Sequence, residues 1–159
     1  MMNDDRLKIY VNDHLALLVA ETELAQRCHG SNQDGALGLF LQQLVGDLLI
    51  EQDVLKEMLR SVGGSESLIK QGMACLAEKA GRFKLNYALL EYSDLSRLVE
   101  LETLGVGAAE RMSFWENLRA TRGADTRLSH VDFAERHEQA QRHYDVLGKH
   151  RLEAATAAL

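Results

Sequence analysis

Apolar residues recur along most of this chain at alternating steps of three and four, which is the spacing of one face of an α-helix. Segments with this pattern are separated by short stretches that contain glycine. The chain has no proline, and this favours long helices because proline interrupts them. We predict four long helices, over residues 4–28, 32–62, 94–122 and 130–157.

Polar residues that commonly cap helices stand before each predicted helix. A glycine follows the first three helices, as is common after a helix end. The second and fourth starts have an Asp three residues after a Ser, which is similar to a capping box with Asp in place of Glu. The expected capping residues are Asn3, Ser31, Ser93 and Ser129, and the expected stops are Gly30, Gly63 and Gly123.

The lengths of the connections indicate how the helices are arranged. The first and second helices are joined by a few residues, as are the third and fourth, and short links make antiparallel neighbours. About 30 residues join the second helix to the third, and we expect a short helix over 66–80 and an extended connection over 82–92. The chain therefore predicts one all-α domain, 1–159, a four-helix bundle with a long crossover that carries one short extra helix.

Two antiparallel helix pairs joined by a long crossover resemble the ferritin-like superfamily, and within it the small bacterial proteins associated with stress. The resemblance is one of architecture and covers nearly the whole chain. It implies a di-iron or di-manganese centre, built from one Glu on each of two helices and a Glu-x-x-His on each of the other two.

The nearest candidate metal ligands are five seam residues: His14, Glu21, Glu51, Glu102 and His137. No Glu-x-x-His occurs anywhere in the chain, so the implied motif is not intact. Counting about 1.5 Å per residue along each helix places His14, Glu51 and His137 at one level beside Trp115. The same count places Glu21 and Glu102, with His150, about 10–15 Å further along the bundle.

The two levels are interpreted separately. The His14, Glu51 and His137 group is either a buried hydrogen-bonded layer that fixes helix register or a mononuclear metal site. The level of Glu21 and Glu102 fits a partly exposed salt-bridge layer. Iron or manganese is the expected cofactor only if the metal interpretation holds, and no other cofactor is indicated.

Charge and composition exclude several classes of function. The net charge is −6 and no basic face is apparent, so we expect neither nucleic-acid binding nor a membrane-surface role. The longest apolar run, residues 15–20, is far shorter than the ~20 residues that a membrane span needs. The acidic start of the chain is unlike a signal peptide, and Cys28 and Cys75 lack metal or redox spacing, so we expect a cytoplasmic protein.

Two further patterns carry weaker signals. Gly105-Val106-Gly107 is similar to part of a dinucleotide-binding loop, but it lies inside a helical pattern with no strand before it. His130, His137, His143 and His150 recur at steps of seven, six and seven, which keeps them broadly on one side of the last helix but too far apart to share an ion.

We therefore expect a non-catalytic bundle that acts through self-association or a partner protein. A homodimer is expected through the apolar segment 15–20 or through a glycine-rich flank of the second helix, Gly35, Gly38 and Gly46, where another helix could approach closely. The alternative is a metal-dependent oxidase or metal-storage protein with a non-standard site in the core. A third hypothesis, a small apolar ligand inside the bundle, has no supporting residue.

Overall fold

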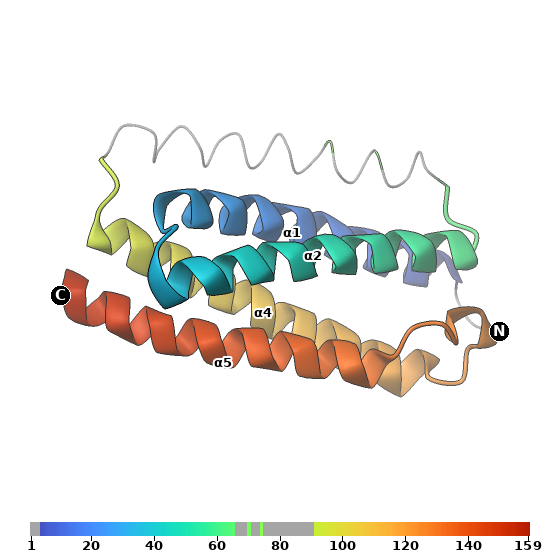
Figure 1. Cartoon of the computed structure of the whole chain (residues 1–159). Coiled ribbons are helices and arrows are strands. Elements are labelled where there is room, and N and C mark those ends of the chain that lie inside the picture. The colour runs from blue at the N-terminus through green and yellow to red at the C-terminus, as the bar shows by residue number, and fades with distance from the viewer. Residues whose placement is uncertain (1–3, 66–69, 71–73, 75–90) are drawn as a thin grey trace.

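The computed structural model describes residues 4–65, 70, 74 and 91–159. Four long α-helices and one short 3-10 helix follow one another along the described chain (Figure 1). Their bounds are α1 Asp4–Ser31, α2 Gly35–Ser61, α4 Asp94–Arg122, the 3-10 helix η1 Thr126–Leu128, and α5 Phe133–Ala158. The predicted helix over 66–80 and extended segment over 82–92 lie outside the described residues, except for residues 70, 74, 91 and 92.

The helices form two antiparallel pairs, α1 with α2 and α4 with α5 (Figure 1). Helix α2 ends at one end of the bundle and α4 begins at the opposite end (Figure 1). This confirms the predicted all-α four-helix bundle with a long connection between the second and third long helices. Among the described residues, no helix combines the length and the apolar character that crossing a membrane requires.

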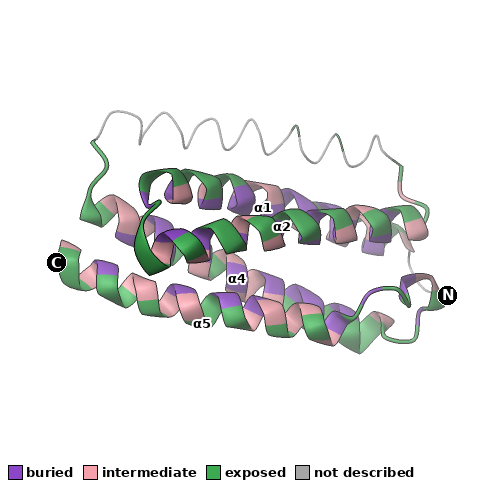
Figure 2. Cartoon of the chain, in the orientation of Figure 1, coloured by how far each residue is buried: buried purple, intermediate pink, exposed green. Residues whose placement is uncertain are grey.

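The inward faces of the helices are buried (Figure 2). The core between them is built mainly of leucine. The predicted seams supply most of it, because positions spaced by three and four share one helix face. The run 15–20 belongs largely to this interior: Leu15, Ala16 and Leu18 are buried, and only Leu17 is clearly exposed, at 48%. The fully buried large side chains are Leu15, Leu41, Leu44, Leu48, Leu55, Met58, Leu59, Leu101, Leu104, Phe114, Trp115 and Leu118.

Helix boundaries follow the capping residues only in part. Ser93 caps α4 as predicted and forms a reciprocal capping box with Ser96. The predicted caps Ser31 and Ser129 are wrong, because Ser31 is the last residue of α1 and Ser129 follows η1. Helix α5 is capped instead by Asp132, whose side chain accepts a hydrogen bond from the Glu135 backbone N–H.

Polar contacts close both ends of the bundle. At the start of α1, the Arg127 guanidinium binds Asp4 through both terminal nitrogens and also binds Asp125. At the opposite end, Asn32 accepts a 2.6 Å hydrogen bond from Arg97 and so links the α1–α2 connection to α4. These contacts join the two helix pairs at their ends.

Two of the three glycines on the predicted flank of α2 have local roles. Gly35 has a φ of +68°, a left-handed conformation that favours glycine in the turn before α2. A Cβ at Gly38 would collide with the Gln33 backbone carbonyl. At Gly46, a Cβ would meet nothing within 4 Å, so no other part of the described chain approaches that position.

Candidate functional site

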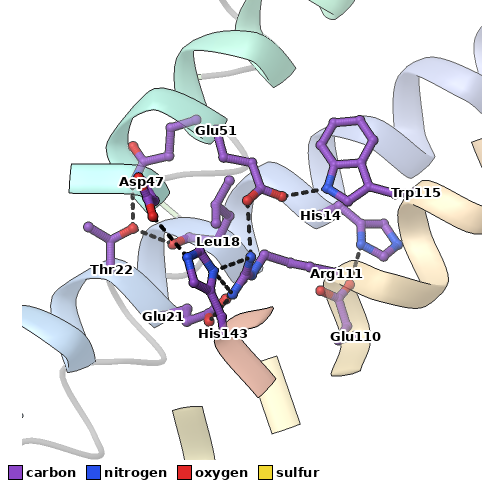
Figure 3. A network of polar contacts seen from close by, with 11 residues as sticks. His14, Leu18, Glu21, Thr22, Asp47, Glu51, Glu110, Arg111, Trp115 and His143 are labelled. Atoms are coloured by element: carbon purple, nitrogen blue, oxygen red, sulfur yellow. Dashed lines mark hydrogen bonds and ion pairs between the residues drawn. The ribbon is translucent and has the colours of Figure 1, made fainter. Parts of the chain in front are cut away.

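A buried arginine lies at the centre of the bundle. Arg111 occupies the inward face of α4, between the core residues Ala108 and Trp115, and only 3% of its side chain is exposed. Its guanidinium points toward α1, α2 and α5, and each of these helices presents a polar side chain to it (Figure 3). We call Glu21, Asp47, Glu51, Arg111 and His143 the charge cluster.

Two carboxylates bind this one guanidinium. Glu21 of α1 accepts two hydrogen bonds, from Nε at 2.9 Å and from Nη2 at 3.1 Å. Glu51 of α2 accepts a third, from Nη1 at 3.1 Å. The paired geometry at Glu21 is the one that makes arginine a strong partner for carboxylates.

The second oxygen of Glu51 has a donor of its own. The Trp115 indole N–H donates to Glu51 Oε1 at 2.6 Å, so every carboxylate oxygen of Glu21 and Glu51 accepts at least one hydrogen bond. A buried polar group without a partner is costly, and this arrangement leaves none on the two carboxylates. The prediction that Trp115 lies beside Glu51 is confirmed.

His143 of α5 connects the arginine to the edge of the bundle. Its Nδ1 faces the two terminal nitrogens of Arg111 at 3.4 Å, and its Nε2 lies 2.9 Å from Asp47 Oδ2. Because the guanidinium can only donate, Nδ1 has to accept and the ring proton belongs on Nε2, where it is donated to Asp47. These contacts assign a neutral His143 with its proton directed at the carboxylate.

The inner part of the cluster carries one surplus negative charge, since two carboxylates face one guanidinium. Burial raises the pKa of Glu21 to about 7, and Arg111 opposes that rise. Burial also raises the pKa of Glu51, again against Arg111. Burial and the charge of Arg111 lower the pKa of His143. The raised pKa values favour proton uptake by these two carboxyl groups, which reduces the surplus charge as pH falls.

A glycine on α4 makes room for Glu21. A Cβ built at Gly107 would lie 2.6 Å from Glu21 Cδ and 2.9 Å from its Oε2, closer than such atoms can approach. Gly107 lies one turn before Arg111, so its missing side chain allows the carboxylate to lie flat against α4 and meet the guanidinium. Within the Gly105-Val106-Gly107 segment, which lies inside α4, Gly107 therefore serves helix packing.

The outer part of the cluster borders a groove of about 340 Å³ between α2 and α5. These two helices approach each other less closely than the members of either antiparallel pair. The groove is open to solvent, and it is lined by Phe40, Gln43, Asp47, Gln139, Arg142, His143 and Val146.

The five candidate ligands predicted from sequence are distributed over several environments. Glu21 and Glu51 meet at Arg111. His14 is instead paired with Glu110 of α4 and stacks on Phe114. Glu102 is exposed on α4, and His137 is half-buried on α5 outside the charge cluster. The structure thus brings together two of the five.

The predicted separation of Glu21 and Glu51 into two levels is wrong, because both bind the same guanidinium. Thr22 and Gln52 also share a 2.7 Å hydrogen bond, which places the neighbouring turns of α1 and α2 side by side. The count of residues measured backbone height from helix ends that were assumed to be level. The long side chains of glutamate and arginine reach across the difference in backbone height.

Sequence reasoning missed Arg111, Asp47 and His143. Arg111 lies on the three–four spacing of the buried positions of α4, but a charged residue is ordinarily exposed, so it was not expected in the core. Asp47 stands one turn before Glu51 on the same side of α2, and that spacing was a usable signal. His143 belonged to the spaced histidine series, and nothing in the series separated it from the other three.

As a chemical arrangement, the cluster satisfies its own donors and acceptors across all four helices. Within the described ranges, no three His, Cys, Asp or Glu side chains are grouped closely enough to hold a metal ion. The hydroxyl group of Thr22 lies beside the cluster. It donates a hydrogen bond to the Leu18 carbonyl and accepts one from Gln52. The geometry is therefore that of a polar tie between helices.

No protein-family model matches this chain, and comparisons with curated proteins and with solved structures found no match. The class defined by the structure is an all-α four-helix bundle with a buried charge cluster.

Proposed function

We propose that this chain is a non-catalytic, ferritin-like helical bundle that acts through self-association or a partner protein, and that its charge cluster has a structural role. The observation that carries the proposal is the position of Arg111. A guanidinium lies between the two central carboxylates and supplies the positive charge that a metal ion would otherwise supply.

The residues present do not fit a di-metal centre. Such a centre uses four carboxylates and two imidazoles around the ions, whereas here two carboxylates, one imidazole and an arginine meet. A metal ion at this position would have to displace a buried guanidinium that forms three charge-assisted hydrogen bonds, and it would then lie beside that positive charge. The metal-dependent oxidase or storage alternative is therefore the weaker candidate.

The ferritin-like assignment rests on architecture. Two antiparallel pairs joined by a connection that spans the bundle are shared with that superfamily, and each of the four long helices contributes to one central polar group, as in its metal sites. A cytoplasmic, stress-related role follows from the resemblance to the small bacterial members.

Self-association is supported by the outer surface. Large apolar side chains are exposed on every long helix, although the interior already has a continuous core. Exposed apolar groups that form larger surfaces are typical of protein contacts. The exposed large apolar residues of the long helices are Ile9, Leu17, Leu39, Leu49, Ile50, Leu95, Val106, Tyr144 and Leu152.

Two measurements on the same sample test the proposal. The protein is produced in medium supplemented with iron and manganese, purified without chelators or a histidine tag, and its metals are counted by mass spectrometry. Its mass is measured by sedimentation velocity over a range of concentrations. We expect far less than one metal ion per chain and a species of twice the 17.8 kDa chain mass.

About two iron or manganese ions per chain, lost in Glu51→Gln, would establish the metal alternative. Metal that remains in Glu51→Gln is bound elsewhere and leaves the role of the cluster as proposed. A monomer at every concentration would overturn the proposed self-association.

A further inference from the structure

We propose that the outer face of the α4–α5 pair is the surface on which a second copy of this chain docks. This inference rests on the proposed self-association and names its surface. A groove of about 490 Å³ runs between the two helices on this face. It is lined by Leu101, Glu102, Gly105, Val106, Ala109, Tyr144, Asp145, Leu147, Gly148 and Arg151.

Large apolar side chains beside this groove are exposed to solvent. Val106 of α4 is 69% exposed and Tyr144 of α5 is 45% exposed. Leu95 and Leu152 are also exposed and extend the apolar strip toward the start of α4 and the end of α5. A tyrosine with an exposed apolar body is a residue type that is enriched at protein interfaces.

Two glycines, Gly105 of α4 and Gly148 of α5, line the groove. A Cβ at Gly105 or at Gly148 would meet nothing within 4 Å, so packing inside the chain requires neither glycine. Each costs a helix about 1 kcal/mol relative to alanine. A partner that approaches the backbone closely gives these two positions a role.

The charged groups at the groove form no ion pair with another described residue. Arg151 is only partly exposed, and neither it nor Glu102 forms an ion pair within the part of the chain that the structure describes. Asp145 accepts a hydrogen bond from the neutral Gln141. The groove therefore presents one positive and two negative groups that a complementary surface can pair.

A second copy provides that complementary surface. Helices α4 and α5 are antiparallel, and the contact of Arg111 with His143 sets their register. Gly105 therefore lies opposite Gly148. Toward one end of the groove from this glycine pair lie Glu102 and Arg151. Toward the other end lie Ala109 and Asp145.

A two-fold axis in the plane of the interface can lie in two ways. With the axis across the helices, α5 packs on the second copy's α5 and Arg151 faces Asp145. With the axis along the helices, α5 packs on α4 and Arg151 faces Glu102, while Val106 enters the space beside Gly148. In both arrangements opposite charges meet and glycines face glycines, so the face is complementary to itself.

The flank of α2 is the competing surface, and it offers less. Gly35 and Gly38 are accounted for by the turn before α2, which leaves Gly46 alone. The large exposed side chains beside it, Leu49 and Ile50, are apolar. The nearby Asp47 and Asp53 already have partners inside the chain, in His143 and Lys56.

The dissociation constant of the dimer is measured by sedimentation for matched variants. Gly148→Gln fills the groove with a good helix former, and we expect it to weaken the dimer about tenfold or more, because the change occurs twice in each dimer. Gly46→Gln is the control on α2 and is expected to leave the dissociation constant unchanged. Arg151→Glu should weaken the dimer similarly by turning attraction into repulsion.

A second charge exchange then tests the pairing. Adding Asp145→Arg or Glu102→Arg to Arg151→Glu should restore most of the affinity in one of the two combinations, and the one that does so identifies the axis. A dimer that tolerates Gly148→Gln and Arg151→Glu but dissociates in Gly46→Gln would overturn this surface while leaving self-association intact. A wild-type monomer would overturn self-association itself.

Discussion

Arg111 is a charged residue at a buried position of α4. Whether it stabilises or destabilises the fold depends on its partners. A buried ion pair has to recover the cost of taking its charges out of water, and it does so only with good geometry and satisfied hydrogen bonds. Arg111 meets this condition through three carboxylate hydrogen bonds from a nearly inaccessible guanidinium. Removing it leaves Glu21 and Glu51 facing each other without a cation.

We expect Arg111→Met to lower the free energy of unfolding by about 3–5 kcal/mol at pH 7.5, because one-sided removal of a buried ion pair leaves an uncompensated charge. Denaturation in urea monitored by circular dichroism measures the change. Arg119→Met, an exposed position on the same helix, should stay within about 0.5 kcal/mol of the wild type. Equal stabilities for Arg111→Met and the wild type would contradict the proposed structural role.

The surplus negative charge makes stability depend on pH. The pKa of Glu21 is about 7 in the folded chain and near its ordinary value of 4.5 in the unfolded chain. The folded state therefore binds more protons between these two values, and stability falls as pH rises from about 4.5 to 7. The lowered pKa of His143 acts in the opposite direction below its ordinary value of 6.5.

A variant isolates the contribution of Glu21. Between pH 5.5 and 7.5, the wild type should lose about 1–2 kcal/mol more unfolding free energy than Glu21→Gln, which cannot bind the extra proton. Urea titrations at both pH values measure this double difference, in which the His143 contribution cancels. Parallel pH profiles for the two proteins would show that Glu21 has an ordinary pKa in the folded chain.

Gly107 lowers the intrinsic stability of helix α4, because glycine has a low helix propensity, but it leaves the space that Glu21 occupies. Replacing a glycine in a helix by alanine ordinarily stabilises by about 0.5–1 kcal/mol. At Gly107, the added Cβ would force Glu21 away from Arg111, so we expect Gly107→Ala to destabilise by about 1–3 kcal/mol.

Gly46→Ala is the matched comparison, since its Cβ meets nothing within 4 Å and α2 should gain the ordinary amount. Thermal and urea unfolding of the two variants measure both signs. If Gly107→Ala stabilised the protein as much as Gly46→Ala, Glu21 would not lie against α4.

The helices and their pairing were predictable from sequence, whereas their ends were less so. Spacing by three and four identifies a buried face from many residues together, so a misjudged position does not change the result. A helix end depends on a single cap, and Ser31 and Ser129 had suitable side chains without the required position. The Asp132 side chain does reach the Glu135 backbone N–H, so Asp132 is the residue that caps α5.

Some residues of the candidate site were predictable from sequence, but their arrangement was not. Glu21, Glu51 and Trp115 were recognisable because polar or indole groups on an apolar seam need partners. Their meeting point was not, since it depends on the relative height of four helices and on how far the Arg111 side chain reaches. Asp47 and His143 extend the network to the α2–α5 groove, and that extension follows only from the spacing between those two helices.

The cluster joins the two helix pairs to each other. Helices α4 and α5 approach each other over most of their length, as α1 and α2 do to a lesser degree, whereas α1 approaches α4 over less and α2 approaches α5 at few points. The bonds from Arg111 to Glu21 and Glu51 cross from one pair to the other, as does the bond from His143 to Asp47. The cluster thus connects two hairpins whose helices approach each other more closely within each pair than between the pairs.

Hydrogen exchange can test this connection. In the wild type, we expect the central amides of all four helices to open with one free energy, equal to that of global unfolding. In Arg111→Met, the α1–α2 amides and the α4–α5 amides should separate into two classes, because each hairpin can open without the other. A core variant within one pair, Leu118→Ala, should lower protection in all four helices together. If Arg111→Met also kept a single class, apolar packing alone would couple the two hairpins and the cluster would only fill space between them.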